Sequence, residues 1–265
     1  MNMRSVVVGW LLAGSLGVAQ AAIKEDPVTY KAGDTTLKGY VVYDDASSAK
    51  RPGIIVVHEW WGITPHIHGE ARRLAQQGYT AFVADMFGDG KTADNPKDAG
   101  ALSGAVMKDP AVMQLRFDAA KNTLATHRTV DASRIGAEGF CFGGSVVLDM
   151  ARAGENLVAV SAFHAGLGAD VPPAAPGKVK AKILVQNGTD DPFIKPDTVT
   201  AFKSEMDAAK VDYRYIGYPG AVHAFTNPQA TELGKKFNLP IAYNAQVDKD
   251  AKAESEKFFA QTLKR

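Results

Sequence analysis

The stretch Gly139-Phe140-Cys141-Phe142-Gly143-Gly144 decides the predicted fold. It ends the apolar run Arg134–Phe140, which is typical of a buried strand, and it precedes Ser145–Gly154, which has a helical pattern. Gly139 and Gly143 fit the motif G-x-S-x-G of a sharp strand-to-helix turn, with cysteine at the nucleophile's position. Side chains at those two positions would clash in so tight a turn. The motif therefore predicts that Cys141 lies at a helix N-terminus.

Cys141 is the only cysteine among the 265 residues. The chain therefore forms no internal disulfide, and no second cysteine is present to resolve an oxidised thiol. A helix N-terminus favours a thiolate through the helix dipole. We therefore expect Cys141 to be a nucleophile. The alternative is a buried structural cysteine in the turn.

Short apolar runs alternate with helical patterns on both sides of this turn. The runs are rich in β-branched residues, as expected for parallel strands buried on both faces: Gly53–His58, Thr80–Asp85, Val158–Phe163, Lys182–Gly188 and Tyr213–Gly220. Helices are expected at His68–Gly78, Asp109–His127, Lys195–Lys210 and Val247–Arg265. This alternation predicts an α/β fold, with a mostly parallel central sheet flanked by helices on both faces.

Three further segments complete the predicted domain. Val28–Asp45 alternates and turns at Gly33-Asp34, which indicates an antiparallel hairpin. The last helix has one apolar stripe and is expected to pack on the sheet through Val247, Ala251, Phe259 and Leu263. Gly88–Lys108 is glycine-rich and has no clear period, so we expect a surface loop over the site.

The segment Met1–Ala21 has the pattern of a secretory signal peptide. Arg4 precedes an apolar stretch shorter than the ~20 residues of a membrane-spanning helix, and small residues end the segment. We expect cleavage before Ala22, a single domain over residues 22–265, and export, with the periplasm as the expected location. An uncleaved anchor or a buried helix is the alternative.

Charge and histidine spacing argue against several kinds of partner. The chain has 30 Lys and Arg against 29 Asp and Glu, and Arg4 is removed with the signal segment. A balanced surface argues against nucleic acid. We expect no membrane attachment after cleavage, and a monomer. The spacing of His58, His66 and His68 matches no common metal motif, so no metal or other cofactor is expected.

Two partners for Cys141 follow it along the chain. A nucleophile on such a turn is followed first by an acid and then by a histidine. Asp190 and Asp191 follow an apolar run; we choose Asp191, and Asp190 stays open. His223 follows the last run. Singly, these residues are as well explained by an Asx-turn and a surface histidine, but together they predict a Cys-His-Asp triad.

The stretch His58-Glu59-Trp60-Trp61-Gly62 is the second informative one. It ends a predicted strand, where this fold places a backbone donor to an oxyanion. We expect the oxyanion hole from the backbone N–H groups of Phe142 and Trp60. Glu59 is then next to the site. The tryptophans either line the substrate cleft or pack in the core; Trp61 and Phe225 are the pocket residues that we expect.

Four stretches, in this order, resemble the dienelactone hydrolase (carboxymethylenebutenolidase) family, which has the α/β-hydrolase fold. They are HEWWG (58–62), GFCFGG (139–144), NGTDDPFI (187–194) and GAVHAF (220–225). The resemblance covers nearly all of the chain after residue 21. It implies a triad of Cys141, His223 and Asp191. It also implies that Glu59 pairs with the resting thiol and releases it when substrate binds.

One feature departs from the family. Arginines hold the substrate carboxylate in dienelactone hydrolases, one of them shortly after the catalytic histidine. Here His223 is followed by Ala224-Phe225-Thr226-Asn227, and Met86–Lys91 also lacks arginine. Lys91 is the one replacement cation, without the bidentate geometry of arginine.

These observations predict a carboxylic ester hydrolase. It would cleave a small lactone or ester by attack of Cys141 and pass through an acyl-thioester. Two alternatives remain. One is a carboxylesterase of broad specificity for unrelated small esters; the other is a non-catalytic binding protein on the same scaffold.

Overall fold

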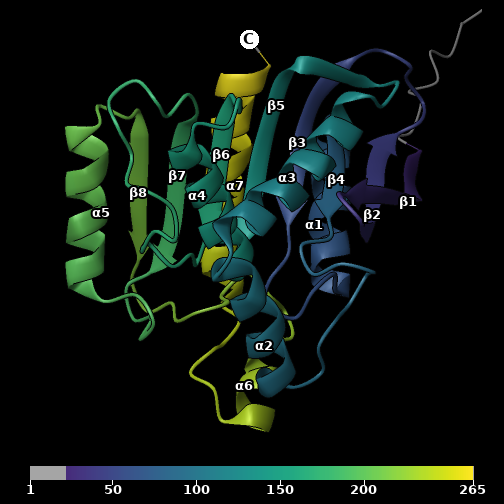
Figure 1. Ribbon diagram of the computed structural model, residues 1–265. Helices are drawn as coiled ribbons and strands as arrows, with labels where there is room; N and C mark the ends of the chain where they lie inside the picture. Colours follow the sequence, from purple (N-terminus) through teal and green to yellow (C-terminus); the bar gives the residue numbers. More distant parts are fainter. Residues whose placement is uncertain (1–21, 265) are drawn as a thin grey trace, which may run out of the picture.

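The structure is a computed structural model that describes residues 22–264. The predicted signal segment Met1–Ala21 lies outside the described residues. One eight-stranded sheet forms the centre of the molecule, in the order β1-β2-β4-β3-β5-β6-β7-β8 (Figure 1). The strands are β1 (Ile23–Ala32), β2 (Thr35–Asp44), β3 (Arg51–Val57), β4 (Thr80–Ala84), β5 (Val130–Phe140), β6 (Ala159–Phe163), β7 (Lys182–Gly188) and β8 (Tyr213–Tyr218).

Strand directions follow the sequence pattern. β1 and β2 form the antiparallel hairpin, and β2 pairs antiparallel with β4. Every pairing from β4 through β3, β5, β6 and β7 to β8 is parallel. The predicted α/β class and the mostly parallel sheet are thus confirmed. The loops that follow the parallel strands therefore meet at one edge of the sheet.

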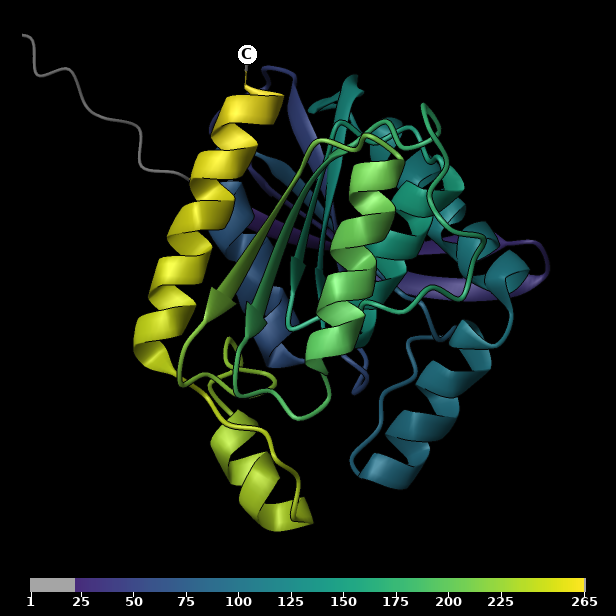
Figure 2. The same ribbon diagram turned by 90° about the vertical axis from the view of Figure 1, so that its left-hand side faces the viewer.

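Helices cover both faces of the sheet (Figure 2). α1 and α7 pack on one face, and α3, α4 and α5 pack on the other. The helices are α1 (Pro65–Gln76), α2 (Pro96–Met107), α3 (Pro110–Ala125), α4 (Phe142–Ala153), α5 (Pro196–Ala208), α6 (Ala230–Phe237) and α7 (Ala245–Leu263). The buried stripe of α7 includes the four apolar residues predicted from its periodicity.

The strand β3 shows why its sequence is continuously apolar. Ile54 and Val56 belong to the core under α1 and α7, whereas Ile55 and Val57 belong to the core under α3, α4 and α5. All four side chains are fully buried. Successive side chains point to opposite faces of a strand, so a strand covered on both faces needs apolar residues at every position.

The expectation of a loop over Gly88–Lys108 is wrong for its second half, which forms α2. Asn95 caps this helix by accepting a hydrogen bond from the backbone N–H of Asp98 (3.0 Å), and Pro96 occupies the first turn. Of its twelve residues only Ala99 and Val106 are buried, so the helix lacks the apolar stripe that marks a packed helix.

α6 was not predicted either, and it projects with α2 from the same end of the molecule (Figures 1 and 2). α1 begins at Pro65, three residues before the predicted start. Within residues 22–264, no helix has the length and apolar character needed to cross a membrane.

Candidate active site

The turn between β5 and α4 places Cys141 at the carboxyl edge of the sheet. Its backbone has φ 55° and ψ −117°, a conformation that residues other than glycine rarely adopt. A Cβ on Gly139 would lie 2.1 Å from the carbonyl oxygen of Gly143, and one on Gly143 would lie 2.2 Å from the carbonyl oxygen of Val57. The turn thus requires both glycines. It exposes the sulfur beside the first turn of α4, where the helix dipole favours negative charge.

The structure brings Cys141, His223 and Asp191 together. Nε2 of His223 lies 3.0 Å from Sγ of Cys141, and Nδ1 of His223 lies 2.7 Å from Oδ2 of Asp191. The three residues come from the loops after β5, β8 and β7. Asp190, the open alternative, is exposed and accepts a hydrogen bond from the hydroxyl of Thr189 instead.

His223 lies between a sulfur and a carboxylate, and both favour its protonated form. Burial by itself lowers the pKa of this imidazole, but Cys141 and Asp191 outweigh burial and raise the pKa to about 10. Asp191 is held in place by the backbone N–H of Phe193, which donates to its Oδ1 (2.8 Å). The arrangement places a protonated imidazole beside the sulfur and orients it with a buried aspartate.

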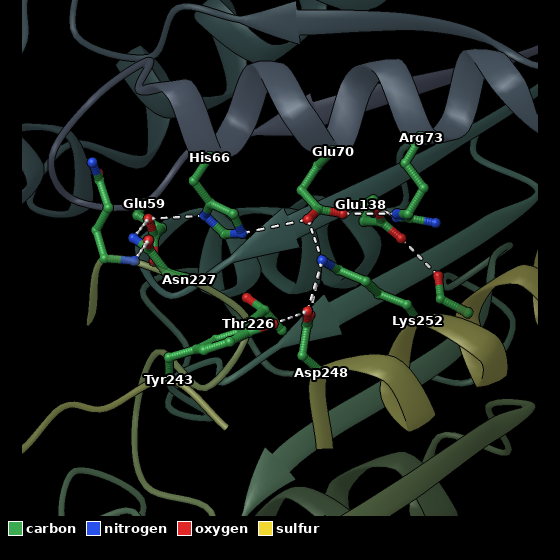
Figure 3. Close-up of polar contacts among 12 residues, drawn as sticks. Glu59, His66, Glu70, Arg73, Glu138, Thr226, Asn227, Tyr243, Asp248 and Lys252 are labelled. Atoms are coloured by element: carbon green, nitrogen blue, oxygen red, sulfur yellow. Dashed lines mark hydrogen bonds and ion pairs between the residues drawn. The ribbon is translucent and has the colours of Figure 1, made fainter. Parts of the chain in front are cut away.

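Glu59, in the loop after β3, is buried, and its carboxylate contacts Asn227 and His66 (Figure 3). Its Oε2 accepts a hydrogen bond from Nδ2 of Asn227 (2.7 Å) and lies 3.2 Å from Nδ1 of His66. The resemblance implied that Glu59 pairs with the resting thiol. In this structure Glu59 instead contacts the amide and the imidazole, while the sulfur of Cys141 contacts His223.

His58 fixes the loop that carries Glu59 and Trp60. The backbone N–H of Met86 donates to its Nε2 (3.2 Å), so Nδ1 carries the proton and donates to the carbonyl oxygen of Glu59 (2.6 Å). Burial lowers the pKa of this histidine, which keeps it neutral. Its ring also stacks on that of Phe142 at the start of α4 (5.7 Å between ring centroids), and Trp60 and Phe142 both lie at the wall of the cavity described next.

A cavity of about 430 Å³ opens over Cys141. Its walls come from α2, from the first turn of α4, from the turns after β3, β5, β6, β7 and β8, and from the segment after α6. They consist of Glu59, Trp60, Trp61, Gly100, Ser103, Gly104, Met107, Cys141, Phe142, Ser145, Gly166, Phe193, Ile194, His223, Ala224, Leu239 and Ile241. No lysine or arginine is among these lining residues.

The two expected pocket residues have different places. Trp61 lines the cavity and stacks on Phe237 at 5.9 Å between ring centroids. Phe225 is fully buried in the core against Tyr218 and His164, so the expectation that it lines the pocket is wrong. Ala224, one residue earlier, has φ 60°, and the chain turns there so that the aromatic ring enters the core.

Sequence reasoning did not find the partners of Glu59. His66 was considered only as a metal ligand, and within residues 22–264 no three His, Cys, Asp or Glu side chains gather as a metal site. Asn227 appeared only as one of the residues that replace the family's arginine. Their position in the sequence is the one available signal. His66 lies in the first turn of α1, the helix that follows the loop with Glu59, and Asn227 follows His223 by four residues.

Comparisons with known proteins identify the family of this chain. A sequence model of the dienelactone hydrolase family matches residues 37–263. The chain is 30% identical to the protein usf of Aquifex pyrophilus, over 74% of this chain and 86% of the relative. It is 26% identical to a Synechocystis protein provisionally named carboxymethylenebutenolidase, over 91% and 98%.

A solved structure is also similar. It is described as a dienelactone hydrolase-like promiscuous phosphotriesterase from metagenomic libraries. It superposes with a TM-score of 0.84 at 32% identity, covering 92% of this chain and all of the other.

Proposed function

This chain belongs to the dienelactone hydrolase family and is a hydrolase that acts on esters, and we propose that Cys141 is its nucleophile in a Cys-His-Asp triad. The observation that supports this proposal is the position of His223, 3.0 Å from the sulfur and 2.7 Å from the carboxylate of Asp191. A base that contacts both a nucleophile and an orienting acid is the usual arrangement for acyl transfer.

The proposed reaction has two stages. The thiolate of Cys141 adds to the ester carbonyl, and the oxyanion receives hydrogen bonds from the backbone N–H groups of Phe142 and Trp60. The C–O bond then breaks, the leaving oxygen takes the proton of His223, and an acyl-thioester remains. Water gives a proton to His223 and attacks the thioester, which releases the acid and restores the thiolate.

A carboxylesterase of broad specificity is the second candidate, and the cavity favours it over a dedicated dienelactone hydrolase. Dienelactone carries a carboxylate, whereas no lysine or arginine lines this cavity. Most of the lining is apolar or aromatic, which suits uncharged acyl groups. A neutral phosphotriester meets the same requirements, and one relative is described as a promiscuous phosphotriesterase.

The proposal is tested with p-nitrophenyl acetate, a dienelactone and a p-nitrophenyl phosphotriester. We expect the unmodified protein to hydrolyse the acetate, and Cys141→Ala to lose about 10³-fold or more in kcat/KM, because the triad acts as a unit. Mass spectrometry after rapid acid quenching is expected to show an acyl group on Cys141. Full activity of Cys141→Ala would exclude the thiol as nucleophile, and no turnover of any of the three substrates would contradict the proposal.

A further inference from the structure

A network of buried and half-buried ionisable side chains leads from the cavity into the protein (Figure 3). It starts at Glu59 in the cavity wall and continues through His66 and Glu70 on α1. Glu70 then pairs with Arg73 of the same helix and with Lys252 of α7. The proposed triad mechanism uses none of these residues, so this network has a role outside that mechanism.

His66 lies between two carboxylates. Its Nδ1 is 3.2 Å from Oε2 of Glu59, and its Nε2 is 3.5 Å from Oε1 of Glu70. A carboxylate on each side of the ring favours its protonated form, because a carboxylate attracts a cation and accepts hydrogen bonds. Burial alone would lower the pKa of His66, but the two carboxylates raise it to about 9.

Arg73 and Lys252 hold Glu70, which is the carboxylate on the side of His66 away from the cavity. Nε of Arg73 donates to Oε2 of Glu70 (2.8 Å), and Nζ of Lys252 lies 2.7 Å from its Oε1. Arg73 also pairs with the fully buried Glu138 on β5. Each charge thus has an opposite charge beside it, which a buried network requires.

Glu59 is the member of this network that lines the cavity. Glu59 lines the cavity, whereas His66 and Asn227 lie behind it and are not among the lining residues. Cys141 and His223 together have no net charge, whether the proton between them lies on the sulfur or on the imidazole. Lys236, on the neighbouring α6, places its Nζ over the ring of Phe237 at 4.8 Å. A bound acyl group therefore meets the carboxylate of Glu59 in the wall, whereas the cation that pairs with it, His66, lies behind the wall.

We propose that Glu59 makes the site select uncharged acyl groups and reject esters or lactones that carry a carboxylate, with His66 as the positioning residue that holds Glu59 in the wall. Two carboxylates at close range in a partly dry cavity repel each other, and the substrate's carboxylate would also lose its hydration without gaining a partner. This is selection by a repulsive element. The inference rests on the proposed esterase function and names its substrate class.

The test compares two esters of one shape. Methyl p-nitrophenyl adipate is neutral, and mono-p-nitrophenyl adipate has the same chain with a terminal carboxylate. We expect the unmodified protein to favour the neutral ester in kcat/KM by about 100-fold at pH 7.5. Glu59→Gln, which removes the charge at nearly constant shape, is expected to reduce this ratio by about 10-fold or more.

Matched variants separate charge from structure. Glu59→Asp retains a carboxylate, so we expect it to retain the preference even if both rates fall. His66→Gln removes the imidazolium that holds Glu59 in the wall, so the carboxylate loses its fixed position, and we expect a ratio between those of the unmodified protein and Glu59→Gln. Thermal unfolding followed by circular dichroism verifies that each variant is folded.

The outcomes distinguish this inference from the function beneath it. If both esters are hydrolysed equally well, or if Glu59→Gln keeps the ratio of the unmodified protein, the inference is overturned and the esterase proposal stands. If neither ester is hydrolysed, the proposed function fails and the selectivity fails with it.

Discussion

The neighbouring residues Asp190 and Asp191 show how one position along the chain separates a surface carboxylate from a buried one. Asp191 is 3% exposed and contacts the imidazole of His223, whereas Asp190 is exposed and contacts the hydroxyl of Thr189. A buried carboxylate that accepts from the imidazole fixes its tautomer and stabilises its protonated form. An exposed carboxylate a residue earlier does neither.

We therefore predict different effects for one substitution at the two positions. Asp191→Asn preserves size but removes the charge that orients His223, and we expect it to lower kcat/KM for p-nitrophenyl acetate by roughly 10²–10⁴-fold. Asp190→Asn serves as the control and is expected to change kcat/KM by less than about twofold. Steady-state kinetics on both variants provides the measurement; equal losses at the two positions would contradict the assigned role of Asp191.

Residue types and spacing predict that Cys141, Asp191 and His223 lie together, because each follows a strand and the ends of parallel strands meet at one edge of the sheet. They predict the pocket poorly, as Phe225 shows. Its direction depends on the positive φ of Ala224, and alanine carries no sign of such a conformation. The contacts of His66 and Asn227 with Glu59 were not predicted for a related reason: tertiary packing brings the start of α1 and the segment after β8 to Glu59, and no sequence period marks such a contact.

Helix α2 shows why a helix that borders a cavity is harder to predict than a helix that packs on the sheet. Its cavity side consists of Gly100, Ser103, Gly104 and Met107. Helices that pack on the sheet, such as α7, have an apolar stripe and were predicted from it. A helix that borders a cavity needs small residues there instead, so its periodicity is weak and the sequence resembles a loop.

The glycines of α2 make the width of the cavity adjustable. A Cβ on Gly104 would meet no atom within 4 Å, so a larger side chain enters open space rather than the core. We predict that Gly104→Leu lowers kcat/KM for p-nitrophenyl octanoate about 10-fold more than for the acetate, because leucine fills volume that a long acyl chain needs. The helix itself is expected to gain up to about 1 kcal/mol, since glycine is a poor helix former.

Gly69 on α1 offers the matched control. Its Cβ position is also free of neighbours within 4 Å, but it does not line the cavity. Gly69→Leu is therefore expected to leave the ratio of octanoate to acetate hydrolysis unchanged. The same ratio in both leucine variants would mean that α2 does not limit the acyl chain.

Across the whole molecule, the network of ionisable side chains behind the cavity joins helices and a strand that are distant in the sequence. α1, β5 and α7 contribute Glu70 and Arg73, Glu138, and Lys252, respectively. These elements also pack through apolar side chains on one face of the sheet, among them Ile67, Phe140 and Phe259. The ionic contacts thus lie within a packed layer, so a change in one charge affects the folding free energy of the entire domain.

The titration of His66 predicts how that free energy depends on pH. The pKa of His66 is about 9 in the folded protein and close to 6.5 in an unfolded chain. Between these values the folded state binds more protons than the unfolded state. The stabilisation from His66 is therefore complete below about pH 6.5 and declines as the pH rises through 9. We expect the free energy of unfolding to fall by roughly 1–3 kcal/mol between pH 7 and pH 9.5 from this residue.

Urea unfolding of the unmodified protein and of His66→Gln, at half-unit steps from pH 7 to pH 9.5, isolates this contribution. His223, whose pKa is raised to about 10, titrates in both proteins and cancels in the difference. His66→Gln is expected to be less stable at pH 7, because it leaves Glu59 and Glu70 facing a neutral side chain, and the two proteins should approach each other in stability by pH 9.5. Curves that stay parallel over this range would show that His66 is not ionised in the folded protein, and the fixed carboxylate in the cavity wall would then lose the cation that holds it.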